Sequence, residues 1–489
     1  MAKFIGRSTR VILFGDSVYI EFRFSLSGAL TMPDKISVDS SAGRLSVGKS
    51  RLAGGAAAEA NGRMSFRTQK SDTARIWCEV DLDAVSHNVR VLRGLLKHGA
   101  GMMAVVKTEA YGHGAVAVSR AALAAGASRL GVNEISEGIA LRDAGIEAPI
   151  QLLTSCLPEE LSDGIDSKLT FAVSSIDEMK VLADRSRALL QGVRRGQRTK
   201  VHLMVDTGMG RGGFGPEELW PAVEHIKAEK TLELEGVFTH FSSAEEADPD
   251  PTRQQINLFR KLMRYCEERR VRFPVRHAAN SAGTVFHPKA QLDMVRCGVL
   301  LHGLRAWPQK RDGLELLPSL SVYTRILQIA KRPAGWTVGY NRTHVCQRES
   351  LLATLPVGYG DGYRRALTGR SYVIMRGVQV PIVGTISMNC IVADITALAH
   401  HPAGLPEVGE QVTLIGGGAA NRISVEEIAD KSGTIPYVVT TQLGTNVERR
   451  YVGASTALPA EPPAEVRRPQ EMRVVNAPRA ETPARIASA

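Results

Sequence analysis

The sequence predicts an α/β protein in which a (β/α)8 TIM-type barrel is followed by a mostly β C-terminal domain. Eight short apolar runs alternate with helix-length spacers, which is the pattern of such a barrel. After about residue 312 the chain changes to short β-rich segments separated by Gly, Pro and Asp turns. A chain of 489 residues is also too long for one core. We therefore expect a barrel over residues 76–312 and a β-rich domain over 313–453.

The expected barrel opens with an alternating, strand-like segment at 77–82, after which Asp83 would cap a helix with an apolar face. The eight apolar runs that would form the barrel strands are 102–106, 129–133, 150–154, 170–174, 201–206, 234–239, 275–279 and 294–300. A doubly wound sheet is the competing arrangement. It would be expected to show a G-x-G-x-x-G turn after its first strand, and the sequence has none there.

The second domain is expected to hold strands and one helix near 424–431. Its strand segments are 320–330, 350–356, 371–383, 389–395 and 411–415. The three glycines at 416–418 lack the Lys-Ser/Thr of a phosphate loop and indicate a turn.

Two end segments lack the periodicity of a packed fold. Residues 1–75 become Ser/Gly/Ala-rich, with a weak strand pair within 11–32, and are expected to be a poorly ordered extension. Residues 454–489 are rich in Pro, Ala, Arg and Glu and are expected to be a disordered tail. An early apolar run ends at Gly15-Asp16 and is therefore too short for a signal peptide.

The formal net charge of +11 is concentrated outside the expected domains. Residues 1–75 hold twelve Lys and Arg against six Asp and Glu, and the tail holds five Arg against four Glu, which leaves +4 for the rest. With no supporting motif, we expect no nucleic-acid partner. Six scattered cysteines without metal-ligand spacing argue for a reducing, cytoplasmic compartment and against a structural metal site. No apolar run is long enough for a membrane span.

The apolar run 102–106 ends on Lys107, and a short loop follows in which two glycines bracket His113. Such a run is typical of a strand buried on both faces, which would place Lys107 at the carboxyl end of a strand, where α/β proteins locate their chemistry. Burial lowers the pKa of a lysine, and its free amine can then bond to an aldehyde carbon. A lysine that extends into solvent is the alternative.

The segment Ala104-Val-Val-Lys107-x-x-Ala-Tyr111-Gly-His-Gly114 resembles the pyridoxal-phosphate signature of alanine racemases, in which the lysine carries the cofactor. The resemblance extends over roughly residues 76–453. It implies that Lys107 holds pyridoxal 5'-phosphate and that Tyr111 belongs to the cofactor site.

Arg211 follows a strand that ends at Asp206 and lies in a glycine-rich loop. A guanidinium grips a carboxylate through two hydrogen bonds, although an arginine in such a loop is more often a surface residue. By resemblance, Arg211 helps to hold the substrate carboxylate. Many racemases brace this arginine with a carbamylated lysine two residues before the Asp, whereas this chain has Met204.

The loops after the seventh and eighth strands commonly bind phosphate in barrels. The resemblance assigns this role to a hydroxyl, to two positions in the following loop and to a tyrosine of the second domain: Ser281, Gly298, Val299 and Tyr437.

Arg296 on the eighth strand corresponds to the arginine that faces the pyridine nitrogen of the cofactor in the family. A permanent cation donates a hydrogen bond but leaves that nitrogen unprotonated, which favours simple removal and return of the α-proton. The resemblance implies that His240 hydrogen-bonds and orients Arg296. His302 stands where the family usually has Tyr, which we interpret as a packing variation.

The second domain contributes three further residues by resemblance. Tyr340, in Val-Gly-Tyr-Asn, corresponds to the second catalytic base, although a tyrosine in a surface turn is the alternative. Tyr359 would line the substrate entrance. Met388 would offer its backbone N–H to the substrate carboxylate, and Asn389 replaces the usual Asp.

These assignments predict a PLP-dependent alanine racemase that interconverts L- and D-alanine, with Lys107 and Tyr340 as bases on opposite faces of Cα. In the family, the equivalents of Tyr340 and Met388 reach the partner's barrel, so a homodimer is implied, as is a supply of D-alanine for peptidoglycan. The alternatives are a serine or broad-specificity racemase, a decarboxylase of the same architecture, and a non-catalytic PLP-binding barrel protein.

Overall fold

The computed structural model of the 489-residue chain describes residues 73–190, 197–305, 307, 311–418, 421–444 and 446–453. Before residue 73 it gives the backbone of five short strands only: β1 (Lys3–Phe4), β2 (Thr9–Phe14), β3 (Ser17–Phe22), β4 (Ile36–Asp39) and β5 (Arg44–Val47). β2 pairs with β3 in an antiparallel manner. The other expectations for 1–72 and the disordered tail expected at 454–489 lie outside the described residues.

The eight expected barrel strands are confirmed. They are β7 (Gly101–Val105), β8 (Arg129–Val132), β9 (Ile150–Leu152), β10 (Phe171–Val173), β11 (Thr199–Met204), β12 (Leu232–Phe238), β13 (Val275–His277) and β14 (Met294–Cys297). They form one parallel sheet in the order β10-β11-β12-β13-β14-β7-β8-β9. A bridge between Gln151 and Thr170 joins β9 to β10 and closes the barrel.

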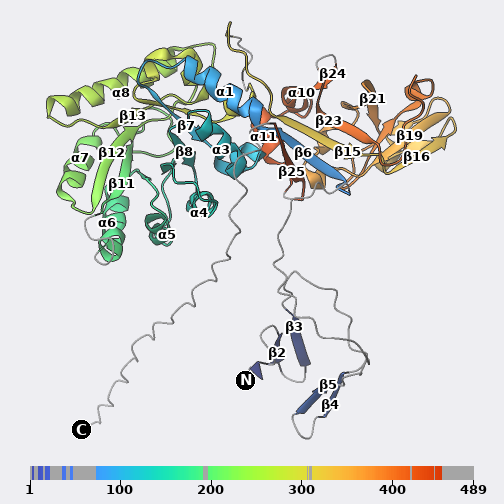
Figure 1. Ribbon diagram of the computed structural model, residues 1–489, viewed down its shortest axis with the longest axis horizontal. Coiled ribbons are helices and arrows are strands. Elements are labelled where there is room, and N and C mark those ends of the chain that lie inside the picture. The colour runs from blue at the N-terminus through green and yellow to red at the C-terminus, as the bar shows by residue number, and fades with distance from the viewer. Residues whose placement is uncertain are drawn as a thin grey trace, which may run out of the picture. The chain divides into compact units, whose positions relative to one another are not determined.

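Helices follow the strands and lie around them, as the blue-to-green part of Figure 1 shows. They are α3 (Ala115–Ala124), α4 (Ile135–Asp143), α5 (Leu161–Asp166), α6 (Ile176–Leu190), α7 (Leu219–Ala228), α8 (Asp250–Glu268) and α9 (Ser281–Phe286). α8 shows why these segments are helical: Ile256, Phe259 and Met263 recur at helical spacing and are buried on one face.

The start of the barrel differs from the prediction in two ways. Helix α1 (Leu82–Gly94) is capped by Asp81, whose carboxylate accepts the N–H groups of Asp83 and Ala84, so Asp83 is not the cap. The strand before it, β6 (Ile76–Asp81), pairs with β15 and β25 of the second domain and not with the barrel. Its alternating pattern identified a strand but carried no information about its partner, so the barrel begins later than residue 76.

The second domain is built on a mixed sheet, drawn mostly in orange in Figure 1. Its main strands are β15 (Leu320–Arg325), β16 (Gln328–Arg332), β19 (Ser350–Leu355), β20 (Tyr372–Met375), β21 (Val378–Val383), β22 (Ile391–Asp394), β23 (Gln411–Gly418), β24 (Asn421–Ile423) and β25 (Glu448–Val452). Between β16 and β19 in the sequence, β17 (Thr337–Val338) and β18 (His344–Val345) form a small antiparallel hairpin. One buried apolar cluster continues from the barrel into this domain.

The expected helix is present as α10 (Val425–Lys431), but it is not the only helix of this domain. A second helix, α11 (Pro436–Thr441), was not predicted, although it begins with a proline in its first turn, which is a helix start signal.

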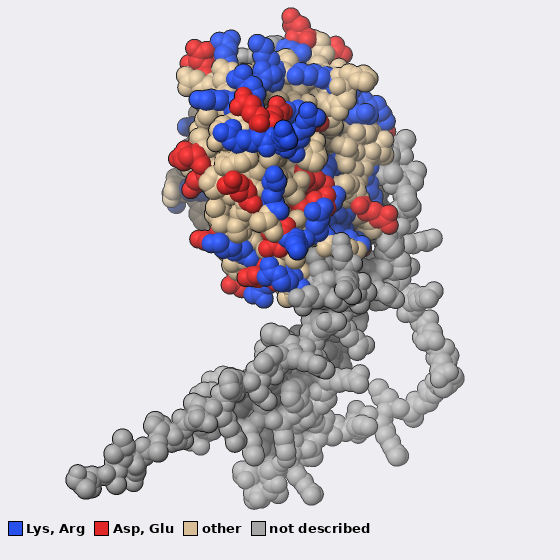
Figure 2. Space-filling view, turned by 90° about the vertical axis from the view of Figure 1, so that its left-hand side faces the viewer, with Lys and Arg blue, Asp and Glu red and all other residues tan. Residues whose placement is uncertain are grey.

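Charged side chains of both signs are mixed on the face that Figure 2 shows. That face therefore presents no large area of one charge. Among the residues that the structure describes, no helix combines the length and apolar character needed to cross a membrane.

Candidate active site

Lys107 lies just past the end of β7 and begins an unusual turn. In the segment α2 (Lys107–Gly112), residues 108–111 all have positive φ, between 49° and 58°, and therefore form a left-handed helical turn where a plain loop was expected. None of the four is a glycine, so each costs about 1–2 kcal/mol. Such strain persists only where the surroundings enforce it, and it is concentrated at functional sites.

Contacts from both domains hold this turn in place. The carboxylate of Glu137 on α4 accepts the backbone N–H of Thr108 and, at 2.8 Å, that of Asn133. The second domain packs closely against the two glycines that bracket His113. A Cβ on Gly112 would collide with the carbonyl of Thr440, and one on Gly114 with the hydroxyl of Tyr451. The junction of the domains therefore fixes the backbone that carries Lys107.

The amine of Lys107 forms no hydrogen bond or ion pair with any described residue. Burial lowers its pKa, the positive charge of Arg211 lowers it further, and Glu137 opposes the shift. A larger fraction of this amine is therefore neutral and nucleophilic than for an exposed lysine.

Arg296, on β14, is buried and is held by neutral groups. Its guanidinium donates to the carbonyls of Thr239 and Ala278 at 2.8 and 2.9 Å, and to Nδ1 of His277 and His240 at 2.9 and 3.2 Å. The expected His240–Arg296 hydrogen bond is therefore present. Burial lowers the pKa of Arg296 to about 9, so the side chain is still a cation at neutral pH. Its Nε–H is used by no hydrogen bond within the described part of the chain, which leaves a donor for a ring nitrogen.

Three cationic side chains, those of Arg296, Arg211 and Lys107, lie near His240 at the barrel mouth. The pKa of His240 is lowered to about 3, first by burial and then by these three positive charges. Neither arginine forms an ion pair with a carboxylate of the described residues. Three neighbouring positive charges with so little internal compensation suit a ligand that carries negative charge.

The residues expected to bind phosphate meet around Gly298. Its backbone N–H donates to the hydroxyl of Ser281 at 3.1 Å, and a Cβ at this glycine would collide with the hydroxyl of Tyr111. The ring of Tyr437 lies 5.9 Å from that of Tyr111, and Val299 begins the next turn. Hydroxyl and backbone N–H donors near a helix start form a cradle that fits a phosphate group.

Arg211 is exposed, and no described residue hydrogen-bonds to it. Met204 lies in a small apolar cluster with Ala172 and Phe238 and cannot replace a bracing anion. The loop itself is ordered by Asp206, whose carboxylate accepts three successive N–H groups, those of residues 208–210, at 2.8 Å each. The backbone below Arg211 is therefore fixed, while its side chain lacks a partner among the described residues.

Three predicted site residues lie apart from this group. Tyr340, Tyr359 and Met388 belong to the second domain and are 68%, 42% and 55% exposed. They are linked through the backbone around 385–388: Thr385 donates to the carbonyl of Tyr340, and the N–H of Tyr359 donates to that of Ser387. Among the described residues, no hydrogen bond, ion pair or ring contact joins them to Lys107 or Arg296.

Comparisons with known proteins cover both domains. A family model described as the alanine racemase N-terminal domain matches residues 80–306, and one described as its C-terminal domain matches residues 319–451. The alanine racemase of Desulforamulus reducens is 38% identical over 380 residues, which are 77% of this chain and 99% of the relative. This chain belongs to the alanine racemase family.

Solved structures agree with this assignment. The alanine racemase of Streptomyces lavendulae superposes with a TM-score of 0.71 at 33% identity, covering 78% of this chain and 97% of that one. The Bartonella henselae alanine racemase, solved with covalently bound pyridoxal phosphate, has a TM-score of 0.67 at 26% identity and covers 78% and 100%. The activity of the chain is accordingly that of an alanine racemase, an isomerase, and the decarboxylase and non-catalytic alternatives are set aside.

Two polar residues of this racemase barrel were not predicted from the sequence. His277 is fully buried and accepts a hydrogen bond from Arg296, and His202 on β11 is buried beside it. His202 interrupts the apolar run of residues 201–205, which is the signal that could have found it, whereas His277 follows Arg276 and has no such signal. Among the described residues, no group of three or more His, Cys, Asp or Glu is placed to hold a metal ion.

Proposed function

We propose that this protein interconverts L- and D-alanine with pyridoxal 5'-phosphate bound at the barrel mouth through Lys107. The observation that carries the proposal is the group of three cations around His240, which have little negative charge of their own beside them. A phosphorylated cofactor and the carboxylate of an amino acid supply the negative charge that these residues lack.

The described residues fit this cofactor. The donors around Gly298, with Ser281, Val299, Tyr111 and Tyr437, would hold its phosphate. The free Nε–H of Arg296 would donate to its ring nitrogen and keep a proton off it, with His240 orienting the guanidinium. When bound, the cofactor supplies an aldehyde carbon for the substrate nitrogen and a ring that withdraws electrons from Cα.

The two bases act on opposite faces of the substrate. The low-pKa amine of Lys107 takes or returns a proton at Cα on one face, and the hydroxyl of Tyr340 does so on the other. Arg211 and the backbone N–H of Met388 hold the carboxylate, and Tyr359 lines the entrance. Because Tyr340, Tyr359 and Met388 are exposed and none of them forms a hydrogen bond with Lys107 or Arg296, we propose a homodimer in which each site uses both chains.

The biological assignment follows from chemistry and family. D-alanine supply for peptidoglycan suits a racemase of this family. A reducing, cytoplasmic location is supported by the six cysteines, all of which are free in the structure.

Borohydride reduction of the purified holoprotein tests the cofactor site. Peptide mass analysis should find the reduced pyridoxyl group on Lys107, and loss of α-hydrogen from L-alanine in D2O should accompany racemisation. Lys227→Ala, at an exposed lysine of α7, is the matched control for Lys107→Ala and should behave like the unaltered protein. A pyridoxyl group on another residue, or none, would contradict the proposal.

A further inference from the structure

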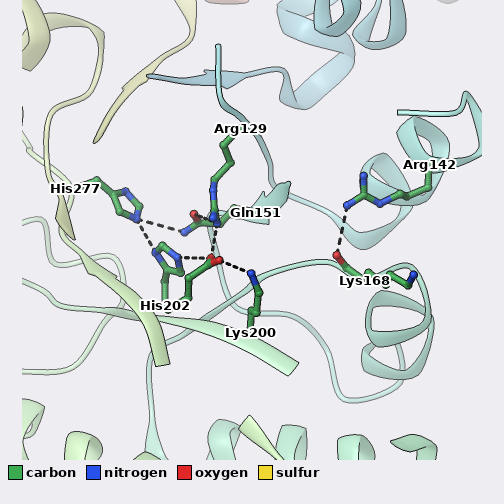
Figure 3. Close-up of polar contacts among 8 residues, drawn as sticks. Arg129, Arg142, Gln151, Lys168, Lys200, His202 and His277 are labelled. Atoms are coloured by element: carbon green, nitrogen blue, oxygen red, sulfur yellow. Dashed lines mark hydrogen bonds and ion pairs between the residues drawn. The ribbon is translucent and has the colours of Figure 1, made fainter. Parts of the chain in front are cut away.

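A chain of hydrogen bonds crosses the barrel interior behind Arg296. Arg296 Nη1 donates to His277 Nδ1 at 2.9 Å, His277 Nε2 lies 2.9 Å from His202 Nδ1, and His202 Nε2 lies 3.0 Å from a carboxylate oxygen of Glu235. Figure 3 shows a dashed contact between the two imidazoles, and further dashed contacts lead past His202 toward Lys200 and Arg129. The side-chain nitrogen of Gln151 also lies 3.5 Å from His277 Nε2, a longer contact than the 2.9 Å to His202. Both imidazoles are inaccessible to solvent.

The far end of this chain of hydrogen bonds lies at the opposite end of the barrel from Lys107. Glu235 accepts from Arg129, the first residue of β8, at 2.7 Å, and from Lys200, the second residue of β11, at 2.9 Å. Arg129 also reaches the side-chain oxygen of Gln151 at 3.3 Å. The chain therefore links the carboxyl ends of the strands, where Arg296 lies, to their amino ends.

The donor and acceptor roles along this chain are fixed from both ends. An arginine can only donate, so His277 Nδ1 is an acceptor and a neutral His277 carries its proton on Nε2. That proton points to His202 Nδ1, so His202 must carry its own proton on Nε2 and donate it to Glu235. An ionised carboxylate can only accept, so both ends impose the same tautomers.

Burial keeps both imidazoles neutral, and nearby cations add to its effect. Burial lowers the pKa of His202 to about 4, and the pKa of His277 is also lowered, by burial and then by Arg296. The pKa of Glu235 is held below its usual range by hydrogen bonds from His202, Arg129 and Lys200, which outweigh its burial. Glu235 is thus an anion at neutral pH, while His202 and His277 are not cations.

We propose that His202 and Glu235 are positioning residues of this racemase, which fix the tautomer and orientation of His277 and thereby aim the Arg296 guanidinium at the cofactor ring. The inference rests on the proposed cofactor site and deepens it. Neither residue touches Lys107 or the expected phosphate cradle, so they act through His277 alone.

Two substitutions of His202 separate positioning from simple packing. Gln can accept from His277 through its oxygen and donate to Glu235 through its amide, so His202→Gln keeps the polarity of the chain. Leu fills the space but leaves His277 without an acceptor. We expect His202→Leu to lower kcat about 10- to 100-fold with KM changed less, and His202→Gln to stay within about threefold of the unaltered enzyme.

The absorbance of the bound cofactor as a function of pH is a second readout, which packing alone would not move. It should shift in His202→Leu, because a loosened Arg296 no longer controls the ring nitrogen, and should be unchanged in His202→Gln. Glu235→Gln should also shift it, whereas Glu233→Gln, which alters a carboxylate on the same strand that is 38% exposed, should not. If His202→Leu does not fold, the comparison of the Glu235→Gln and Glu233→Gln spectra tests the proposal in its place.

The possible results are distinguishable. If His202→Leu, or Glu235→Gln in its place, binds cofactor, racemises alanine and shows the spectrum of the unaltered protein, the positioning role is overturned while the proposed function stands. Equal losses in His202→Gln and His202→Leu without a spectral shift would also overturn it. If the unaltered protein carries no pyridoxyl group on Lys107, the proposed function fails, and the inference fails with it.

Discussion

The barrel mouth and the exposed patch of the second domain, formed by Tyr340, Tyr359 and Met388, are built in opposite ways. At the mouth, Arg296 is buried and four acceptors from its own chain hold it. In the patch, the two tyrosine hydroxyls form no hydrogen bond with any described residue, and all three side chains reach solvent. One half of the proposed site is thus completed by folding, and the other half is left exposed.

This difference separates stability from function. Substitutions at the mouth should reduce both, because they break contacts within the fold, whereas substitutions in the patch should reduce function alone.

Arg296→Leu should have the largest effect, because it leaves four buried acceptors without a donor. We expect the free energy of unfolding to fall by about 3–5 kcal/mol, with racemisation lost. Denaturant unfolding of the cofactor-free protein checks this prediction. An unchanged denaturation midpoint would show that the hydrogen bonds of Arg296 do not stabilise the fold.

Tyr340→Phe should lower racemisation about 10²- to 10⁴-fold, the range for loss of an acid–base group, and leave unfolding unchanged within about 0.5 kcal/mol. Tyr265→Phe, at an exposed tyrosine of α8, is the control and should alter neither quantity. Loss of stability in Tyr340→Phe would break the contrast between the two regions.

Mixing the Lys107→Ala and Tyr340→Phe proteins, each inactive alone, tests whether a site is shared. After the subunits are exchanged at random, half of the dimers are mixed and each has one intact site of two, so about a quarter of full activity should return. A site made within one chain would recover nothing. Refolded mixtures assayed for racemisation give the answer.

Acid should destabilise the barrel before the second domain. Burial lowers the pKa values of His113 and His202 to about 4 and that of His240 to about 3, below about 6.5 for an unfolded histidine. As pH falls from about 6.5 toward 4, the unfolded chain gains protons that the folded chain does not bind. The free energy of unfolding should then drop by about 1.4 kcal/mol per pH unit for each histidine.

Hydrogen exchange at pH 7 and pH 5 measures this acid effect region by region. Barrel peptides should lose protection first, because these three histidines lie in the barrel. Earlier loss in peptides of 320–418 would contradict the prediction.

Asn389→Asp should have the smallest effect. Asn389 is exposed beside Met388, and one added charge near solvent is worth less than about 1 kcal/mol. We expect the ratio of alanine to serine racemisation to change only a few-fold, with unfolding unaltered. Rates on a panel of L-amino acids measure it, and a large change in the ratio would place this position closer to the substrate than proposed.

The sequence determined what local pattern can encode. Runs of apolar residues marked the eight barrel strands, and the apolar run that ends on Lys107 was enough to locate the candidate site. These features can be predicted because burial and strand periodicity act on consecutive residues. The roles of Lys107, Arg296 and Tyr340 came from the family resemblance and not from their spacing.

Tertiary structure decided the rest, because it depends on residues far apart in the chain. The left-handed turn after Lys107 is strained and is held by Glu137 and by the second domain, which no local preference would reveal. The partner of β6 could not be predicted from its sequence, because the alternation of side chains shows which face of a strand is buried but not which strand lies beside it. His202 and His277 are 75 residues apart, and only closure of the barrel brings their rings within hydrogen-bonding distance.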